Sequence, residues 1–126
     1  MKSTLVSGMI HMALAVALGA FGAHALQPKL TAAGTLSTYQ TGNQYHFYHA
    51  LGLLLLGWLM QNKALREAPP GLWSVRLIHI GIVLFSGSLY VLSVSQIKVL
   101  GAITPLGGVC FIAGWGLAAW ACMKKL

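Results

Sequence analysis

Residues 73–94 read WSVRLIHIGIVLFSGSLYVLSV, an apolar stretch in which Arg76 is the single charged residue. About 20 apolar residues in a helix span the hydrocarbon core of a bilayer. The whole chain has this character, since 57% of its 126 residues are hydrophobic and 7% are charged, against about 25% charged in soluble domains. We therefore predict an all-α membrane protein, a compact bundle of four transmembrane helices with short loops. The expected helices cover about 4–26, 43–61, 73–95 and 104–123, within a single domain over residues 1–126.

Helix-breaking and polar segments predict the connections. Residues 27–44 are mixed polar and small and are expected to form an interfacial loop, with an earlier start of the second helix near Ser37 as the alternative. The sequence PPG at 69–71 interrupts the chain before the third helix. The sequence TP at 104–105 predicts an N-cap followed by proline at the first helical position. A cleaved signal peptide is the alternative for residues 5–26, but this stretch exceeds the roughly 7–15 apolar residues of such a segment.

The distribution of positive charge predicts the orientation. Four spans place both termini and the second connection on one side of the membrane. That side carries Lys2, Lys63, Arg66, Arg76, Lys124 and Lys125, and the other side carries Lys29 and Lys98. Because positive residues are enriched on the cytoplasmic side, we expect both termini to be cytoplasmic in an inner (plasma) membrane. The net charge of +7 is scattered over helix ends, so the expected contacts are membrane lipids and not nucleic acid.

Acidic residues are nearly absent, because the chain has no Asp and Glu67 is its single Glu. This composition excludes a Ser-His-Asp triad and hydrolysis by paired carboxylates. It also disfavours Mg²⁺ or Ca²⁺ sites built from carboxylates. No spacing of Ser, Cys and His orients a nucleophile against a base. We therefore expect a protein that is not an enzyme, and leave open a site assembled by folding from distant residues.

Five histidines stand out in a chain this apolar. Their estimated depths predict a polar cluster in the outer half of the membrane and a second pair in the inner half. The cluster comprises His24, His46, His49, Ser86, Ser88 and Tyr90, and the pair comprises His11 and His79. His11 and His24 lie about 20 Å apart along one helix, so they cannot share a site.

These imidazole groups have two interpretations. They can join helices through hydrogen bonds to carbonyls and tyrosines, which we favour, and Ser86 and Ser88 are expected to donate such interhelical bonds. Alternatively, they can bind haem, a metal, a quinone or a lipid headgroup, although the sequence singles out no cofactor. The neighbouring Gln40, Asn43 and Gln44 are interpreted as residues that face lipid headgroups.

Small residues recur at spacings that allow close helix packing in lipid. The expected packing positions are Ala15, Gly19, Gly22, Ala23, Gly87, Gly107, Gly108 and Gly114. We interpret these positions as contacts within the chain, and contacts in a homo-oligomer are the alternative.

Several short motifs resemble those of one family. They are GAFGAH at 19–24, YHAL at 48–51, LFSGSLY at 84–90 and GAITPLGG at 101–108, followed by GW at 114–115. In their order and spacing, over nearly the whole chain, they resemble the YgdD/YwdK-like family of small bacterial membrane proteins, a family of unknown function with distant relatives in eukaryotes. The resemblance implies a four-span inner-membrane protein and names no activity. It draws attention to Phe21, Gly22, His24, Tyr48, His49, Ser86, Gly87, Ser88, Tyr90, Thr104, Pro105, Gly107 and Gly108.

Three kinds of function are weighed. The favoured one is a non-catalytic membrane protein that organises lipid or supports a partner. The alternative is a ligand-binding or redox module that uses His24, His46 or His49. The third is a small transporter. Small multidrug exporters couple transport through a carboxylate within the membrane, and no predicted span here contains one, so a histidine relay would have to replace it.

Overall fold

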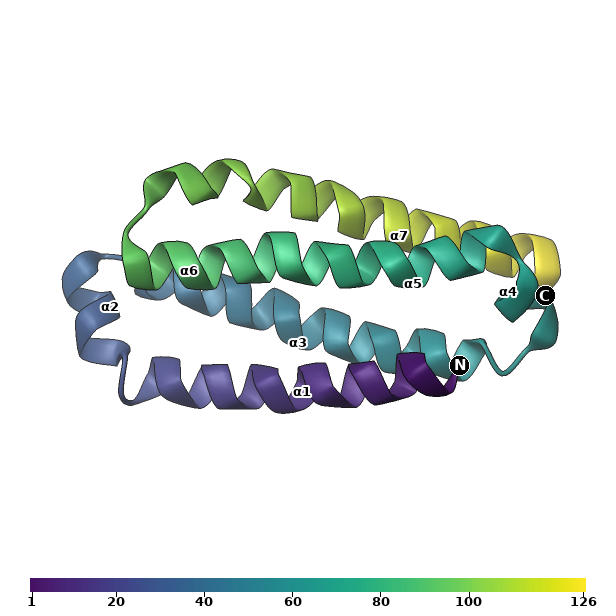
Figure 1. Ribbon diagram of the computed structural model, residues 1–126, viewed down its shortest axis with the longest axis horizontal. Helices are drawn as coiled ribbons and strands as arrows, with labels where there is room; N and C mark the ends of the chain where they lie inside the picture. The colour runs from purple at the N-terminus through teal and green to yellow at the C-terminus, as the bar shows by residue number, and fades with distance from the viewer.

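The computed structural model describes residues 1–126 and is helical, without strands. Its elements in chain order are α1 (Lys2–Ala23), α2 (Gln27–Ala33), α3 (Leu36–Leu59), α4 (Lys63–Glu67), α5 (Pro69–Gly81), the π-helix η1 (Ile82–Gly87), α6 (Ser88–Ser95), the 3₁₀-helix η2 (Lys98–Ala102) and α7 (Thr104–Lys125). Because α5, η1 and α6 follow one another without a break, they form one long rod (Figure 1). The all-α prediction is therefore confirmed.

The long helices lie side by side along one axis (Figure 1). α1 packs along α3, and α7 packs along α5. Contacts of α3 with η1 and α6 join these two pairs. Both chain termini lie at one end of the molecule, which we call the terminal end, and α2 lies at the opposite end, which we call the α2 end.

Three helical stretches are long and apolar enough to cross a membrane: Lys2–Ala23, Pro69–Ser95 and Lys98–Lys125. α3 is also long, with 24 residues, but its first half reads LSTYQTGNQYHF and is largely polar. The structure thus confirms helices that can cross a membrane, whereas the fourth span remains a prediction.

The largest departure from the predicted boundaries falls within residues 27–44. Residues 27–33 form α2 instead of a loop. Gly34 caps the C-terminus of α2, and its φ of 73° is adopted by glycine without steric cost. α3 then begins at Leu36, next to the alternative start near Ser37 and well before residue 43. Polarity suggested a loop here, but several of these polar side chains form hydrogen bonds inside the protein.

Smaller differences occur at the other helix ends. α1 ends at Ala23, three residues before the predicted end at residue 26. α5 begins at Pro69 instead of residue 73, since proline is tolerated in the first turn of a helix. Thr104 is the first residue of α7, and Ile103 takes the N-cap position that the sequence assigned to Thr104.

Apolar side chains fill the space between α3, the α5–η1–α6 rod and α7. The largest buried cluster comprises Leu53, Leu56, Ile78, Ile82, Phe111 and Ala118. The outward face of the same helices is apolar too, as with Ile112, which is 76% exposed, and Val83, which is 65% exposed. Such a surface suits a lipid environment, because soluble monomeric proteins rarely expose apolar patches of this extent.

Small residues lie where helices approach closely. Tight contacts occur at the expected positions Ala15, Gly19, Gly22, Gly107 and Gly114. Gly107 is under the most severe constraint, because a Cβ there would overlap the backbone of Leu84 and Phe85 in η1. Three expected positions are not tight contacts: Ala23 is exposed, and a Cβ on Gly87 or Gly108 would have no neighbour closer than 3.9 Å.

Candidate functional site: a histidine–tyrosine chain

Three side chains from three different helices form a continuous hydrogen-bonded chain in the middle of the molecule. Nδ1 of His11, on α1, lies 3.0 Å from Nε2 of His46, on α3. Nδ1 of His46 lies 3.0 Å from the hydroxyl of Tyr90, on α6. His46 is buried, and the two end residues are half-buried. We call these three residues the His–Tyr chain. Polar groups inside a membrane are costly and therefore mark functional candidates.

Asn43 anchors the tyrosine end of the His–Tyr chain. Its side-chain amide donates one hydrogen to the carbonyl of Ala15, at 2.9 Å, and one to the hydroxyl of Tyr90, at 3.1 Å. The interpretation that Asn43 faces lipid headgroups is therefore wrong. Its amide instead ties α1, α3 and α6 together at one point.

His79 lies beside the other end of the chain. Its ring centroid is 5.8 Å from that of His11. Its Nδ1 donates to the carbonyl of Val75, at 2.9 Å, and its Nε2 lies 2.9 Å from the hydroxyl of Ser7 on α1. The structure thus brings the predicted pair of His11 and His79 together. It also joins this pair to His46 and Tyr90, which the sequence had placed in a separate outer cluster.

His49 is buried close by but takes no part in the chain. Its Nδ1 donates to the carbonyl of Tyr45 one turn earlier in the same helix, at 2.7 Å. Its ring stacks on that of Phe111 in α7, with centroids 3.5 Å apart. His49 is therefore a packing residue between α3 and α7, separate from the His–Tyr chain.

The remaining members of the predicted cluster lie elsewhere. His24 is exposed at the end of α1 and forms no side-chain hydrogen bond. Ser88 forms the expected interhelical bond, 2.6 Å to the hydroxyl of Thr104 on α7. Ser86 does not, because its hydroxyl is buried without any partner. The expectation of an interhelical bond from Ser86 is therefore wrong.

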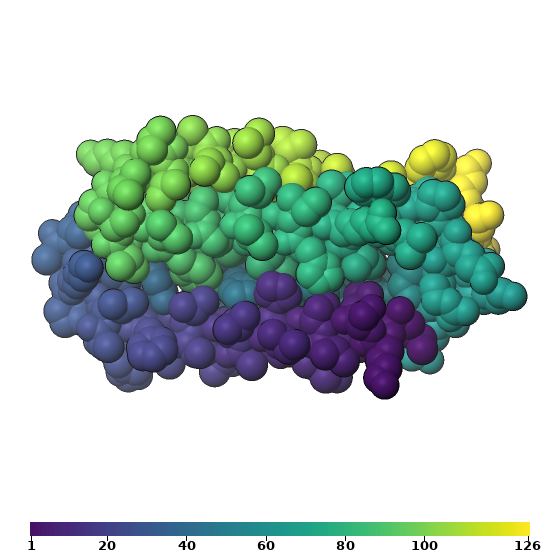
Figure 2. Space-filling model, in the orientation of Figure 1, coloured from purple at the N-terminus to yellow at the C-terminus, as the bar shows by residue number.

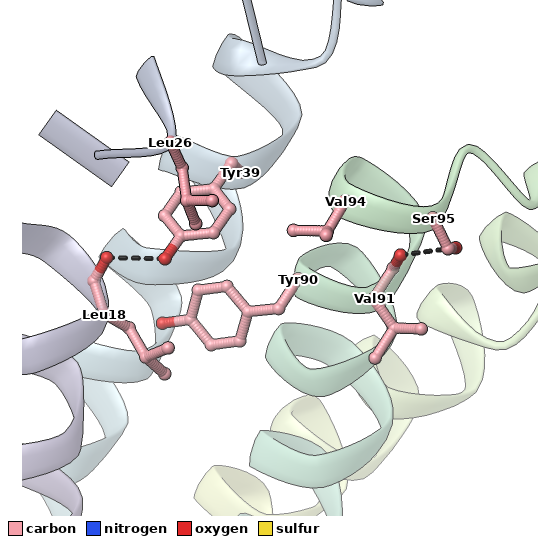
Figure 3. Close-up of a pocket in the computed structure, with 7 residues that line it drawn as sticks. All are labelled: Leu18, Leu26, Tyr39, Tyr90, Val91, Val94 and Ser95. Carbon is pink, nitrogen blue, oxygen red and sulfur yellow. Dashed lines mark hydrogen bonds between the residues drawn. The ribbon is translucent and has the colours of Figure 1, made fainter. Parts of the chain in front are cut away.

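A groove of about 310 Å³ adjoins the tyrosine end of the chain. Its lining residues are Leu18, Leu26, Tyr39, Tyr90, Val91, Val94 and Ser95 (Figure 3). The rings of Tyr39 and Tyr90 lie against each other there, with centroids 5.1 Å apart. The Tyr39 hydroxyl donates to the carbonyl of Leu18, and both tyrosine hydroxyls point towards α1 (Figure 3). We call this feature the tyrosine groove.

The groove and the chain both lie between α1 and the α5–η1–α6 rod. Figure 2 shows α1 in purple bordering the teal and green rod along the length of one face. α1 packs mainly on α3 and has few contacts with the rod itself. Polar bonds therefore supply much of the connection between α1 and the rod, through His79 and Ser7 and through the His–Tyr chain.

The ligand chemistry of the histidines is limited by this geometry. No group of three or more His, Cys, Asp or Glu side chains is arranged to hold a metal ion. Four of the five imidazoles already form hydrogen bonds within the protein. The arrangement therefore favours a structural role or the passage of protons between bonded nitrogens over metal coordination.

Comparison with known proteins identifies the family. Residues 18–108 match the family described as "Protein of unknown function (DUF423)". The chain belongs to this DUF423 family. It is 49% identical over the full length of both chains to the UPF0382 membrane protein YwdK of Bacillus subtilis. It is 44% identical to the UPF0382 membrane protein SSP2132 of Staphylococcus saprophyticus, over 91% of this chain and 92% of the relative. No solved structure matches the chain.

These relatives confirm the YwdK-like resemblance and establish a DUF423 membrane protein. In this DUF423 chain, the polar network also includes Ser7, Tyr39 and Asn43, which were not predicted from the sequence. A usable signal was present, because positions 39, 43 and 46 are spaced i, i+4 and i+7 and so share one face of a helix.

Proposed function

We propose that this DUF423 protein is a non-catalytic, four-span inner-membrane protein that holds one acyl chain of a membrane phospholipid in the tyrosine groove. The observation that carries the proposal is the groove itself. It is apolar, it has a volume of about 310 Å³, and it lies between two helices apolar enough to cross a membrane.

The fourth span in this proposal is α3. A helix with polar residues is tolerated in lipid when those residues are satisfied inside the protein. The polar side chains of Tyr39, Asn43, His46 and His49 each form a hydrogen bond within the protein. α3 also packs along α1 and contacts η1 and α6, so these four side chains are turned away from lipid.

The orientation in this proposal has both termini in the cytoplasm. Both termini lie at the terminal end (Figure 1). Six of the eight cations fall in the segments at this end: Lys2, Lys63, Arg66, Arg76, Lys124 and Lys125. The positive-inside rule then assigns the terminal end to the cytoplasm, and the tyrosine groove to the outer half of the membrane.

Charge at the α2 end favours a phospholipid with an anionic headgroup. Lys29 follows the groove residue Leu26 by three positions, and Lys98 follows Ser95 by three. Both lysines are exposed. A lysine near an anionic lipid surface contributes about 1 kcal/mol to binding. The acyl chain would occupy the apolar groove while the headgroup meets these lysines.

The alternative of a haem, metal or quinone module has weaker support. The imidazole nitrogens of His46 and His79, and Nδ1 of His11, bond to one another, to Tyr90, to Ser7 or to a carbonyl. A cofactor that binds any of these nitrogens would have to replace such a bond, whereas a lipid in the tyrosine groove leaves them intact.

Native mass spectrometry in mild detergent tests the proposal. The variant Val94→Trp fills the groove, and Ile112→Trp is its control, because Ile112 is 76% exposed on a different helix. We expect the wild type and Ile112→Trp to retain one phospholipid per chain and Val94→Trp to lose it. A wild-type chain without lipid, a mass that matches haem or a metal, or equal retention by Val94→Trp would contradict the proposal.

A further inference from the structure

We propose that the His–Tyr chain is a proton relay that connects the tyrosine groove with the terminal-end half of α1. This activity does not require a lipid in the groove, and an acyl chain bound there would compete with the water that brings protons to Tyr90. It uses the hydrogen bonds that join Tyr90 to His46 and His46 to His11, together with the two ring nitrogens that every imidazole offers.

All the hydrogen bonds of the His–Tyr chain can point in one direction, from Tyr90 towards His11. Asn43 donates to the oxygen of Tyr90, so the Tyr90 hydroxyl is free to donate its own proton to Nδ1 of His46. Neutral His46 then carries its proton on Nε2 and donates it to Nδ1 of His11. His11 in turn carries its proton on Nε2, which has no hydrogen-bond partner.

The same atoms also form the reverse arrangement. His11 can donate from Nδ1 to Nε2 of His46, and His46 from Nδ1 to the Tyr90 oxygen. All three groups are neutral in both arrangements, and the heavy atoms keep the same positions. A buried chain that satisfies its bonds in either direction is suited to pass a proton along its length.

One transfer converts the first arrangement into the second. A proton arriving from the groove binds the Tyr90 oxygen, whose original proton moves to Nδ1 of His46. The Nε2 proton of His46 moves to Nδ1 of His11, and the Nε2 proton of His11 leaves towards the terminal end. One proton enters, one leaves, and no electron is transferred. The first arrangement is restored when both imidazoles change tautomer, each losing its Nδ1 proton to water and gaining a proton from water on Nε2.

Each end of the chain reaches a different environment. The Tyr90 ring lines the tyrosine groove at one end. At the other end, His11 lies against His79, with centroids 5.8 Å apart, and His79 bonds to Ser7 in the second turn of α1. The proton donors and acceptors around the chain thus extend from the groove to within a few residues of the start of α1.

None of the groups that face the chain carries a permanent charge. α1 contributes Ser7, α3 contributes Asn43 and Tyr39, and α5 contributes His79. The nearest cation in sequence is Arg76, whose guanidinium lies over the ring of Trp73, 5.1 Å from its centroid. No fixed charge next to the chain therefore opposes the passage of a proton.

Proton flux into liposomes tests the relay. The purified protein is reconstituted into phospholipid vesicles that contain a pH-sensitive dye, and a potassium gradient with valinomycin sets the membrane potential. We expect the wild type to conduct protons faster than protein-free vesicles. Tyr90→Phe removes one hydroxyl from the chain and is expected to lower the flux by about a hundredfold, a typical contribution of one positioned proton-transfer group.

His49→Gln is the matched control, because His49 is a buried histidine of the same helix that bonds to its own helix and not to the chain. This variant is expected to keep the wild-type flux. His11→Phe interrupts the opposite end and serves if Tyr90→Phe does not fold, as judged by circular dichroism. Wild-type flux equal to that of protein-free vesicles would overturn the relay, as would unchanged flux in the folded chain variants. Equal loss in His49→Gln would also overturn it.

Discussion

The two helix pairs of this DUF423 protein are held together in different ways. α7 packs on α5 through apolar and small residues, where Phe111 lies in the core and Gly114 faces Ile78. α1 is instead joined to α3 and to the α5–η1–α6 rod by a series of hydrogen bonds from Ser7, His11, Asn43 and Tyr39. In lipid, helices gain no hydrophobic energy from association. The α5–α7 pair therefore depends on shape, whereas α1 adds specific polar bonds to its close contacts with α3.

The largest loss of stability should come from disturbing the close packing of α7 against the α5–η1–α6 rod. Gly107→Ala places a Cβ against the backbone of Leu84 and Phe85, which cannot move aside as a side chain can. We expect a destabilisation of about 2 kcal/mol, typical of overpacking, measured by thermal unfolding in detergent. Gly116→Ala on the same helix is the control, because a Cβ there meets nothing within 4 Å. An equal effect of the two changes would refute the shape argument.

The next largest loss of stability should come from removing Asn43, which anchors α1. Asn43→Ala removes the bonds to the Ala15 carbonyl and to Tyr90, and we expect a loss of about 1 kcal/mol, in the range for polar contacts between membrane helices. Hydrogen exchange should rise in α1 and stay unchanged in α7. The control is Gln44→Ala, the exposed neighbour. Equal protection of α1 in both variants would mean that Asn43 does not hold this helix.

A smaller coupling is expected across the link between α5 and α1. Ser7→Ala and His79→Phe each remove one side of the 2.9 Å bond between these residues. A double-mutant cycle should give a coupling energy of about 0.6 kcal/mol, the average for such bonds in a membrane protein. Additive effects of the two changes would show that the bond does not contribute.

The smallest effect should come from a polar contact outside the long helices. Lys63 and Glu67 form an ion pair at 4.0 Å, with side chains 76% and 62% exposed. Lys63→Ala is therefore expected to change the stability by less than about 0.5 kcal/mol, because water and salt screen exposed pairs. A larger loss of thermal stability would mean that α4 contributes more than its exposure indicates.

Hydropathy predicted the three helical stretches that are long and apolar enough to cross a membrane. The apolar stretches near the N-terminus, at 73–94 and near the C-terminus all appear as long helices. The start of α3 was placed too late, because residues such as Asn43 were taken as headgroup-facing, whereas folding pairs them with groups on α1 and α6. The polarity of a residue does not by itself reveal whether its partner is water or another helix.

The candidate site was predictable only in part. The similar depths estimated for His11 and His79 correctly predicted that these two residues lie close together. Estimated depth failed for His46, because the bond to His11 depends on how α1 and α3 are offset along their axes. It also failed for His24, which lies one residue beyond the end of α1 and faces outward. The π-helix η1 had no signal in the sequence analysis, and it lies where Gly107 contacts its backbone.

A direct bond between His11 and His46 links α1 to the rest of the molecule. Magic-angle-spinning NMR of the protein in lipid bilayers, with ¹⁵N-labelled histidine, observes this bond directly. We predict a cross peak between Nδ1 of His11 and Nε2 of His46, with one nitrogen protonated and the other not, and its loss in His11→Phe. Spectra in which the two imidazoles show no mutual contact, while the protein is folded, would contradict the account.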